Sequence, residues 1–209
     1  MNGTSLTLGL VGALALAATV RRGSLNRLVL SGDLGALAKY ESLVGLAPSL
    51  MASIESELSD SEDLEDDAAF LMADLLRDKG MDVIGVGGHR VVVRLGKAFV
   101  AKVAALHDGV EQNRHEYETW GRASLHHPKI SALLVPVHDL SAEGAVLLTE
   151  ISKPCDLATG SDLQRCRDAM RRAEKLLASS PLTKNIDDVH HEINWGIHGG
   201  SVKLIDYGR

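Results

Sequence analysis

The chain has 209 residues, of which 45% are hydrophobic and only 3% aromatic, so one medium-sized domain with an aliphatic core and appended segments is expected. The formal net charge of −6 argues against a nucleic-acid-binding protein, because binding to the phosphate backbone relies on clustered lysine and arginine. The two cysteines, Cys155 and Cys166, form no Cys-x-x-Cys pair. We therefore expect buried thiols in a reducing compartment.

The N-terminal segment Gly3–Val20 carries no charge, and Arg21 and Arg22 follow it directly. A membrane-spanning helix needs about twenty apolar residues, so this segment is at the short end of that range. If it spans a membrane, the two arginines place the rest of the chain on the cytoplasmic side. Two interpretations stay open for residues 3–20: a membrane-associated segment, or a soluble apolar helix.

The chain divides by composition into three units. The first is the apolar segment with its basic border. The second is a helical and acidic linker region, in which Pro48 is expected to break a helical pattern and a block of acidic residues follows. The third carries the motifs described below. The three units span residues 1–27, 28–63 and 64–209.

Within the third unit, hydrophobic periodicity and turn residues predict an alternation of helices and strands. A helix is expected first, then three strands, a polar helix, two more strands around a turn, a long helix, and a short strand near the C-terminus. The expected ranges are helix 64–79, a strand with the following glycine-rich turn over 83–88, strands 90–95 and 98–104, helix 110–124, strands 133–137 and 145–150, helix 161–179 and strand 202–205.

A glycine-rich turn, with Gly85, Gly87 and Gly88, lies between the first two strands. Glycine lacks the side chain that would keep phosphate oxygens away from backbone N–H groups, so this turn is a candidate phosphate-binding loop. No Gly-Lys-Ser/Thr follows, and the next element is a strand, which excludes a P-loop and a dinucleotide-binding fingerprint. A glycine-rich hairpin turn without a ligand is the alternative.

Lys102 lies inside an apolar strand, where a buried ammonium group needs a partner of opposite charge. Glu116 on the following helix can supply it, whereas Glu118 points about 160° further around that helix. The alternative is an edge-strand lysine that reaches solvent.

The C-terminal region combines Asp188, Asn194 and the sequence Asp206-Tyr207-Gly208 after a short apolar strand. Phosphoryl transfer uses such a set, with one carboxylate for the acceptor hydroxyl and an amide oxygen and a second carboxylate for Mg²⁺. A zinc site is the alternative for His190 and His191, but no third ligand follows at a defined spacing.

In this order, the motifs over residues 83–209 resemble the protein-kinase-like superfamily, especially the small kinase-like proteins of phages and the aminoglycoside phosphotransferase branch. The resemblance implies an α+β fold, with a small antiparallel sheet as N-lobe and a reduced helical C-lobe, to which the N-terminal apolar helix is appended. A complete kinase continues beyond the Asp-Tyr-Gly motif, so the resemblance implies a C-terminally truncated lobe.

The resemblance also implies site residues for ATP and Mg²⁺. Lys102, held by Glu116, would contact the α- and β-phosphates, and Asp188 would be the catalytic carboxylate, although it lies six residues before Asn194 where the family usually has five. The other implied positions are Gly85, Gly87 and Gly88 over the phosphates, Glu150 at the segment that meets the adenine edge, and Asn194 and Asp206 on Mg²⁺.

Two functions follow as expectations. The first is an ATP–Mg²⁺-dependent phosphotransferase that acts on an unknown hydroxyl acceptor. The second is a non-catalytic kinase-like module that binds a nucleotide or a protein partner, as a virion component or a membrane-tethered protein. Both place the chain in the cytoplasm, at the cytoplasmic side of a membrane, or in a virion.

Overall fold

The computed structural model describes residues 33–58, 64–155, 158–180 and 187–208. The apolar segment 3–20 lies outside these residues, and so does the N-terminal helix expected there. No helix in the described part of the chain is both long and apolar enough to cross a membrane.

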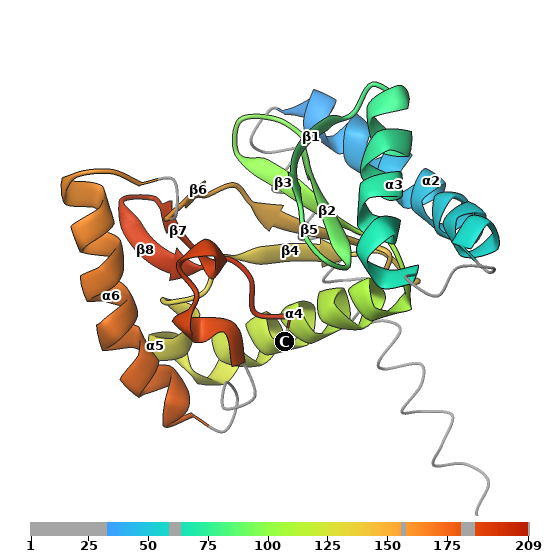
Figure 1. Ribbon diagram of the computed structural model, residues 1–209. Coiled ribbons are helices and arrows are strands. Elements are labelled where there is room, and N and C mark those ends of the chain that lie inside the picture. The colour runs from blue at the N-terminus through green and yellow to red at the C-terminus, as the bar shows by residue number, and fades with distance from the viewer. Residues whose placement is uncertain (1–32, 59–63, 156–157, 181–186, 209) are drawn as a thin grey trace, which may run out of the picture.

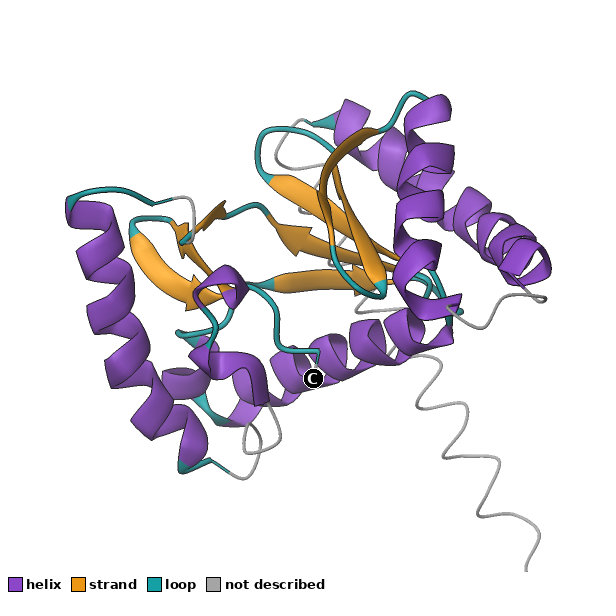
Figure 2. Ribbon diagram, in the orientation of Figure 1, coloured by secondary structure: helices purple, strands orange, loops and turns teal. Residues whose placement is uncertain are grey.

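The fold is α+β and is built on a five-stranded antiparallel sheet with the strand order β1-β2-β3-β5-β4. Figure 2 shows the strands in the middle of the molecule and the helices around them. The strands of this sheet are β1 (Asp82–Val86), β2 (Arg90–Arg94), β3 (Phe99–Ala104), β4 (Val137–Leu140) and β5 (Val146–Glu150).

The first three strands form two consecutive hairpins, the first of them at the expected glycine-rich turn. β2 and β3 pair without a break, and Val92 lies opposite Lys102. β1 carries a bulge between Val83 and Gly85, so Gly85 belongs to a strand irregularity. Because directly paired residues share a face of a sheet, Arg90, Val92 and Lys102 project to the same side.

The opposite face of the sheet packs against α2 (Leu34–Leu58) and α3 (Leu64–Asp78) (Figure 1). These two helices and the sheet share one hydrophobic core. The helical region that we expected to be part of a linker is therefore packed into the folded unit. Pro48 was expected to break the helix, yet α2 continues through it. Proline removes one intrahelical hydrogen bond, and the buried Ala47 and Leu50 on either side hold the helix in place through packing.

The face that carries Lys102 meets α4 (His107–His126), which runs beneath the sheet in Figure 1. A second core lies beyond it, and α4 contributes Ala123 to this core. α5 (Pro128–Ser131), α6 (Ser161–Ala178), the 3₁₀ helix Asp187–His190, β7 (Trp195–His198) and β8 (Ser201–Leu204) also contribute, as do Val137 and Leu147 of the large sheet. β6 (Lys153–Pro154) pairs with β7 in a three-stranded sheet with β8, and a second 3₁₀ helix (Glu192–Asn194) directly precedes β7.

The β7–β8 hairpin turns at Gly199 and Gly200, whose φ angles are 55° and 77°. Two successive residues with positive φ are what a tight two-residue hairpin requires, and glycine adopts them without steric cost. The sequence prediction included β8 but not β7, which begins directly after Asn194.

Two expectations for this half of the chain are wrong. Cys155 and Cys166 form a disulfide, with their Cα atoms 6.0 Å apart, instead of remaining free thiols. The strand expected over residues 133–137 begins only at Val137, because the preceding apolar run pairs in parallel with Leu204 at the end of β8.

Candidate functional site

Lys102 and Glu116 form a buried ion pair in the middle of the molecule. The Nζ atom of Lys102 donates to both carboxylate oxygens of Glu116, at 2.8 and 2.9 Å. Their side chains are 8% and 1% exposed, so neither charge is compensated by water. The expected contact between these residues is thus present, and it joins β3 to α4. Lys102 also donates to the backbone carbonyl of Ile205, at 2.7 Å, which brings the C-terminal segment to the same place.

Arg90 is a second buried cation at this point and was not among the predicted site residues. Its Nη1 atom donates to Glu116 Oε1 at 2.7 Å, and its Nη2 atom donates to Oδ1 of Asp206. One guanidinium group therefore bridges the carboxylate on α4 and the carboxylate that follows β8. The planar fork of N–H donors in arginine suits such a bridge between two carboxylates.

Asn113 closes this cluster from the side of α4. Its amide nitrogen donates to the carbonyls of Lys102 and Gly144, at 3.3 and 3.0 Å, and its oxygen accepts from Arg90 at 3.3 Å. Asn113 is fully buried, and these three hydrogen bonds satisfy most of its polar atoms. The amide therefore fixes the position of α4 against β3 and orients the guanidinium group.

The charges of the cluster shift the pKa values of its members in opposite directions. Burial by itself would raise the pKa of Asp206, but Lys102 and Arg90 hold it well below its ordinary value. Burial would lower the pKa of Arg90, but Glu116 and Asp206 raise it above its ordinary value. The two carboxylates and two cations compensate one another, so the site as a whole is close to electrically neutral.

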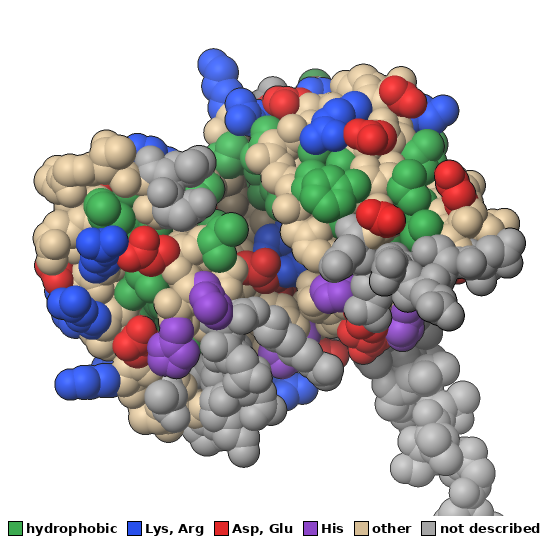
Figure 3. All heavy atoms as spheres, in the orientation of Figure 1, with side chains coloured by type: hydrophobic (Ala, Val, Ile, Leu, Met, Phe, Trp, Pro, Cys, Tyr) green, Lys and Arg blue, Asp and Glu red, His purple; other side chains and the backbone are tan. Residues whose placement is uncertain are grey.

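A pocket of about 350 Å³ opens beside this cluster. Its volume lies within the range of roughly 300–1,000 Å³ that small-ligand sites occupy. Figure 3 shows the molecule hollowed between its two halves, with acidic and basic side chains meeting in the hollow. The lining residues are Gly87, Gly88, His89, Arg90, Val92, Lys102, Gln112 and Asp206.

Two of the three predicted loop glycines line the pocket, and the fold does not require glycine at either of them. Neither Gly87 nor Gly88 has a positive φ angle. A Cβ atom at Gly88 would meet no atom of the described residues within 4 Å, and one at Gly87 would make only an ordinary contact. Gly85 is different, because it does not line the pocket and lies at the bulge in β1.

The predicted C-terminal site residues do not all line the pocket. Asp206 lines the pocket, whereas Asn194 does not. The backbone carbonyl of Asn194 accepts hydrogen bonds from the N–H groups of Ile205 and Asp206, at 2.7 and 3.3 Å, so the 3₁₀ segment abuts the end of β8. The backbone of Asp188 lies in the first 3₁₀ helix, but its side chain is outside what the structure describes.

The arrangement does not fit the magnesium ion that the resemblance implies. Mg²⁺ prefers six oxygen ligands in an octahedral arrangement. Oδ1 of Asp206 already accepts from Arg90 and lies 3.8 Å from the ammonium of Lys102. Across the described ranges, no three His, Cys, Asp or Glu side chains gather in a way that would hold a metal. The expected ligand position at Asp206 is thus engaged by protein cations.

Glu150, predicted near an adenine edge, does not line this pocket. Its carboxylate lies between two histidines, with Oε1 2.7 Å from His138 Nε2 and Oε2 2.7 Å from His198 Nε2. The Nδ1 atom of His198 is also 3.2 Å from the carbonyl of Ile151. Glu150 therefore links β4 and β5 to the β7–β8 hairpin, and its position indicates a contact between the two halves of the molecule.

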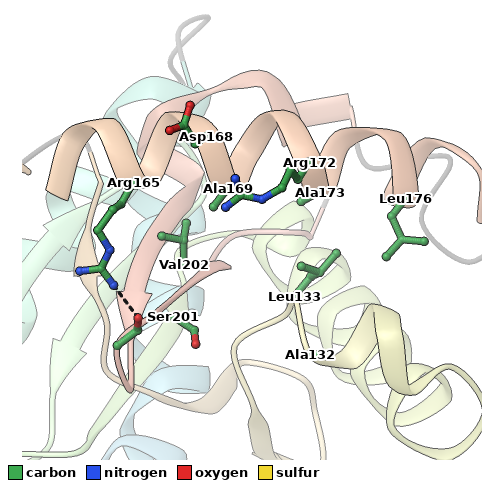
Figure 4. A pocket seen from close by; sticks show the side chains of 11 residues that line it. Ala132, Leu133, Arg165, Asp168, Ala169, Arg172, Ala173, Leu176, Ser201 and Val202 are labelled. Atoms are coloured by element: carbon green, nitrogen blue, oxygen red, sulfur yellow. Dashed lines mark hydrogen bonds between the residues drawn. The ribbon is translucent and has the colours of Figure 1, made fainter. Parts of the chain in front are cut away.

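A larger pocket, of about 550 Å³, lies against α6 and contains none of the predicted site residues. Figure 4 shows Arg165 and Arg172 extending from α6 over Val202 and Leu133. Arg165 donates to the carbonyl of Gly200 at 2.7 Å. This hollow separates the helix from the hairpin turn.

Tyr207 anchors the segment that carries Asp206. The ring belongs to the second core and is 1% exposed, and its hydroxyl donates to the carbonyl of Val135 at 2.9 Å. Burial raises the pKa of this phenol well above its ordinary value, which keeps the donor proton in place. The ring thus holds Asp206 at the mouth of the pocket.

We expect Tyr207→Phe to lower the free energy of unfolding by about 1 kcal/mol, because the Val135 carbonyl is left buried without its donor. Urea denaturation followed by circular dichroism measures the change. Tyr117→Phe is the control, since the Tyr117 hydroxyl makes no hydrogen bond within the described part of the chain, and it should stay close to wild type. Equal stabilities of Tyr207→Phe and wild type would contradict the anchoring role.

Comparison with known proteins adds no family to this description. The chain matches no protein-family model and no curated protein sequence. The function is therefore argued from the pocket and its charged residues.

Proposed function

We propose that this chain is a kinase-like protein that binds the phosphates of a nucleotide, with ATP as the reference ligand, in the pocket beside Lys102. The observation that carries this proposal is the convergence of residues far apart in the sequence on one hollow: Gly88 from the turn after β1, Lys102 from β3 and Asp206 from the segment after β8. Lys102 is held by Glu116 from α4. This set supports the kinase-like N-lobe that the motif order implies.

The glycine turn supports a ligand at this position. Gly88 has neither a conformational nor a packing reason to lack a side chain. A ligand that approaches the backbone closely does require such a position, and phosphate oxygens bound by backbone N–H groups are a common case.

The test is calorimetric titration of ATP into the full chain and into Gly88→Ala. We expect the added methyl group to weaken ATP binding by about tenfold, or roughly 1.4 kcal/mol, without changing the melting temperature. Gly45→Ala, at an open position on α2, is the matched control and should bind as wild type does. Absence of ATP binding to the wild-type chain would overturn the proposal.

ATP-dependent transfer of a phosphoryl group to a hydroxyl acceptor is the second candidate function. It is favoured by the hydrogen bonds from the N–H groups of Ile205 and Asp206 to the carbonyl of Asn194, which join the segment that carries Asn194 to the one that carries Asp206. The measurement is loss of the γ-phosphate in a single-turnover experiment with the wild-type chain and Asp188→Asn. Loss in the wild type alone supports transfer, and binding of ATP without loss supports the non-catalytic module.

A further inference from the structure

Arg90 occupies an unusual position for a buried cation. Its side chain is 6% exposed, and it contacts two carboxylates, Glu116 and Asp206, of which Asp206 lines the pocket. A buried charge is costly unless it is paired and hydrogen-bonded, and Arg90 meets both conditions through Glu116, Asp206 and Asn113. The guanidinium group is thus a built part of the site, and its bonds to α4 and to the segment after β8 fix its direction.

Arg90 also faces the space that a ligand would enter. It lines the pocket together with Lys102 and Asp206, so N–H donors and the carboxylate share one wall. Lys102 is largely occupied, since its ammonium donates to both oxygens of Glu116 and to the carbonyl of Ile205. A planar guanidinium group presents five N–H donors on three nitrogens. The contacts of Arg90 with Glu116, Asn113 and Asp206 use its two Nη atoms.

We propose that Arg90 takes the place of a divalent metal ion, so that the pocket binds a polyphosphate free of metal, with Arg90 and Lys102 as its cations. This inference rests on the proposed nucleotide binding and specifies the form of the ligand. A magnesium ion at Asp206 would lie beside two cations that already contact or approach Oδ1 of the same carboxylate. Repulsion between like charges therefore disfavours the metal complex and favours the free nucleotide.

The experiment is calorimetric titration of ATP into the full chain, once in EDTA and once in excess Mg²⁺. For the wild type we expect tighter binding in EDTA, because excess Mg²⁺ converts the free nucleotide into its metal complex. Arg90→Met should bind ATP at least about tenfold more weakly in EDTA, and Mg²⁺ should restore part of the affinity. Arg94→Met is the matched control on the same strand, since Arg94 is half-exposed, pairs with Asp82 and lies outside this pocket.

Asp206→Asn provides the second variant, which matters because Arg90 is buried and its replacement can unfold the chain. The proposal requires this variant to bind ATP in EDTA as tightly as the wild type, or more tightly, because the carboxylate no longer competes for Arg90. A magnesium-dependent site requires the opposite, since the variant would lose the metal ligand.

The outcomes separate the two proposals. Wild-type binding that needs Mg²⁺ and is lost in Asp206→Asn overturns the metal-free site while nucleotide binding stands. If the wild-type chain binds ATP neither in EDTA nor in excess Mg²⁺, the proposed nucleotide binding is overturned, and with it the metal-free site. Binding in EDTA that weakens in Arg90→Met, or persists in Asp206→Asn where Arg90→Met does not fold, supports the metal-free site.

Discussion

Replacing Glu116 by glutamine should lower the free energy of unfolding by about 3–5 kcal/mol, the range measured when one partner is removed from a buried ion pair. The substitution keeps the size of the side chain but removes the charge that Arg90 and Lys102 share. Only Asp206 then remains to compensate two buried cations, and its side chain is 45% exposed. Guanidinium denaturation of the full chain, followed by circular dichroism, measures the change.

The matched control is Glu118→Gln on the same helix. Glu118 pairs with Arg122 at 3.3 Å, but both side chains are more than half exposed, and an exposed pair of this kind contributes roughly 0–1 kcal/mol. If the two substitutions destabilise the chain equally, Glu116 is not the centre of the charge cluster. A large difference between them assigns the stabilisation to burial and to the second cation.

The Lys102–Glu116 contact could be predicted because two simple constraints point to the same pair. A lysine inside an apolar strand needs a counter-ion, and the geometry of a helix selects one of two nearby glutamates. The rule that directed attention to Lys102 also applied to Arg90, which begins an apolar strand and shares its face with Val92. Because Arg90 lies at the start of the strand that follows the glycine turn, no sequence pattern indicated that it is buried, and it was not predicted as a site residue.

Other features depend on contacts that no local pattern contains. The spacing of Cys155 and Cys166 does not reveal that α6 returns alongside the segment after β6, which brings the two cysteines together. Pro48 breaks an isolated helix, but packing of α2 against the sheet outweighs the lost hydrogen bond. The apolar run before Val137 pairs with Leu204, seventy residues later, and periodicity alone cannot distinguish this run from a strand of the main sheet.

The side chain of Glu150 makes a structural contact that the sequence prediction did not include. Glu150 ends β5, where the chain passes to the second half of the molecule. Its carboxylate contacts two histidines, one of them on β7. The contact between Glu150 and His198 could not be predicted, because His198 lies on β7 and the sequence prediction did not include this strand.

Lys102→Met should weaken ATP binding by about 100-fold, or roughly 2.7 kcal/mol, because it removes a positive charge that lines the pocket where the phosphates would lie. The ammonium reaches the pocket from β3, and no other lysine lines it. The fold should survive the change, since Glu116 keeps its bond to Arg90 at 2.7 Å. Calorimetric titration gives the affinity, and circular dichroism shows whether the variant is folded.

Lys97→Met, at the exposed turn between β2 and β3, removes the same charge five residues away and should leave ATP affinity within about twofold of wild type. This control separates a specific contact from a general loss of positive charge. A folded Lys102→Met variant with wild-type affinity would show that the nucleotide does not meet the ammonium. In that case Lys102 would only connect β3 to α4 and to Ile205, and its replacement would change the free energy of unfolding but not the affinity for ATP.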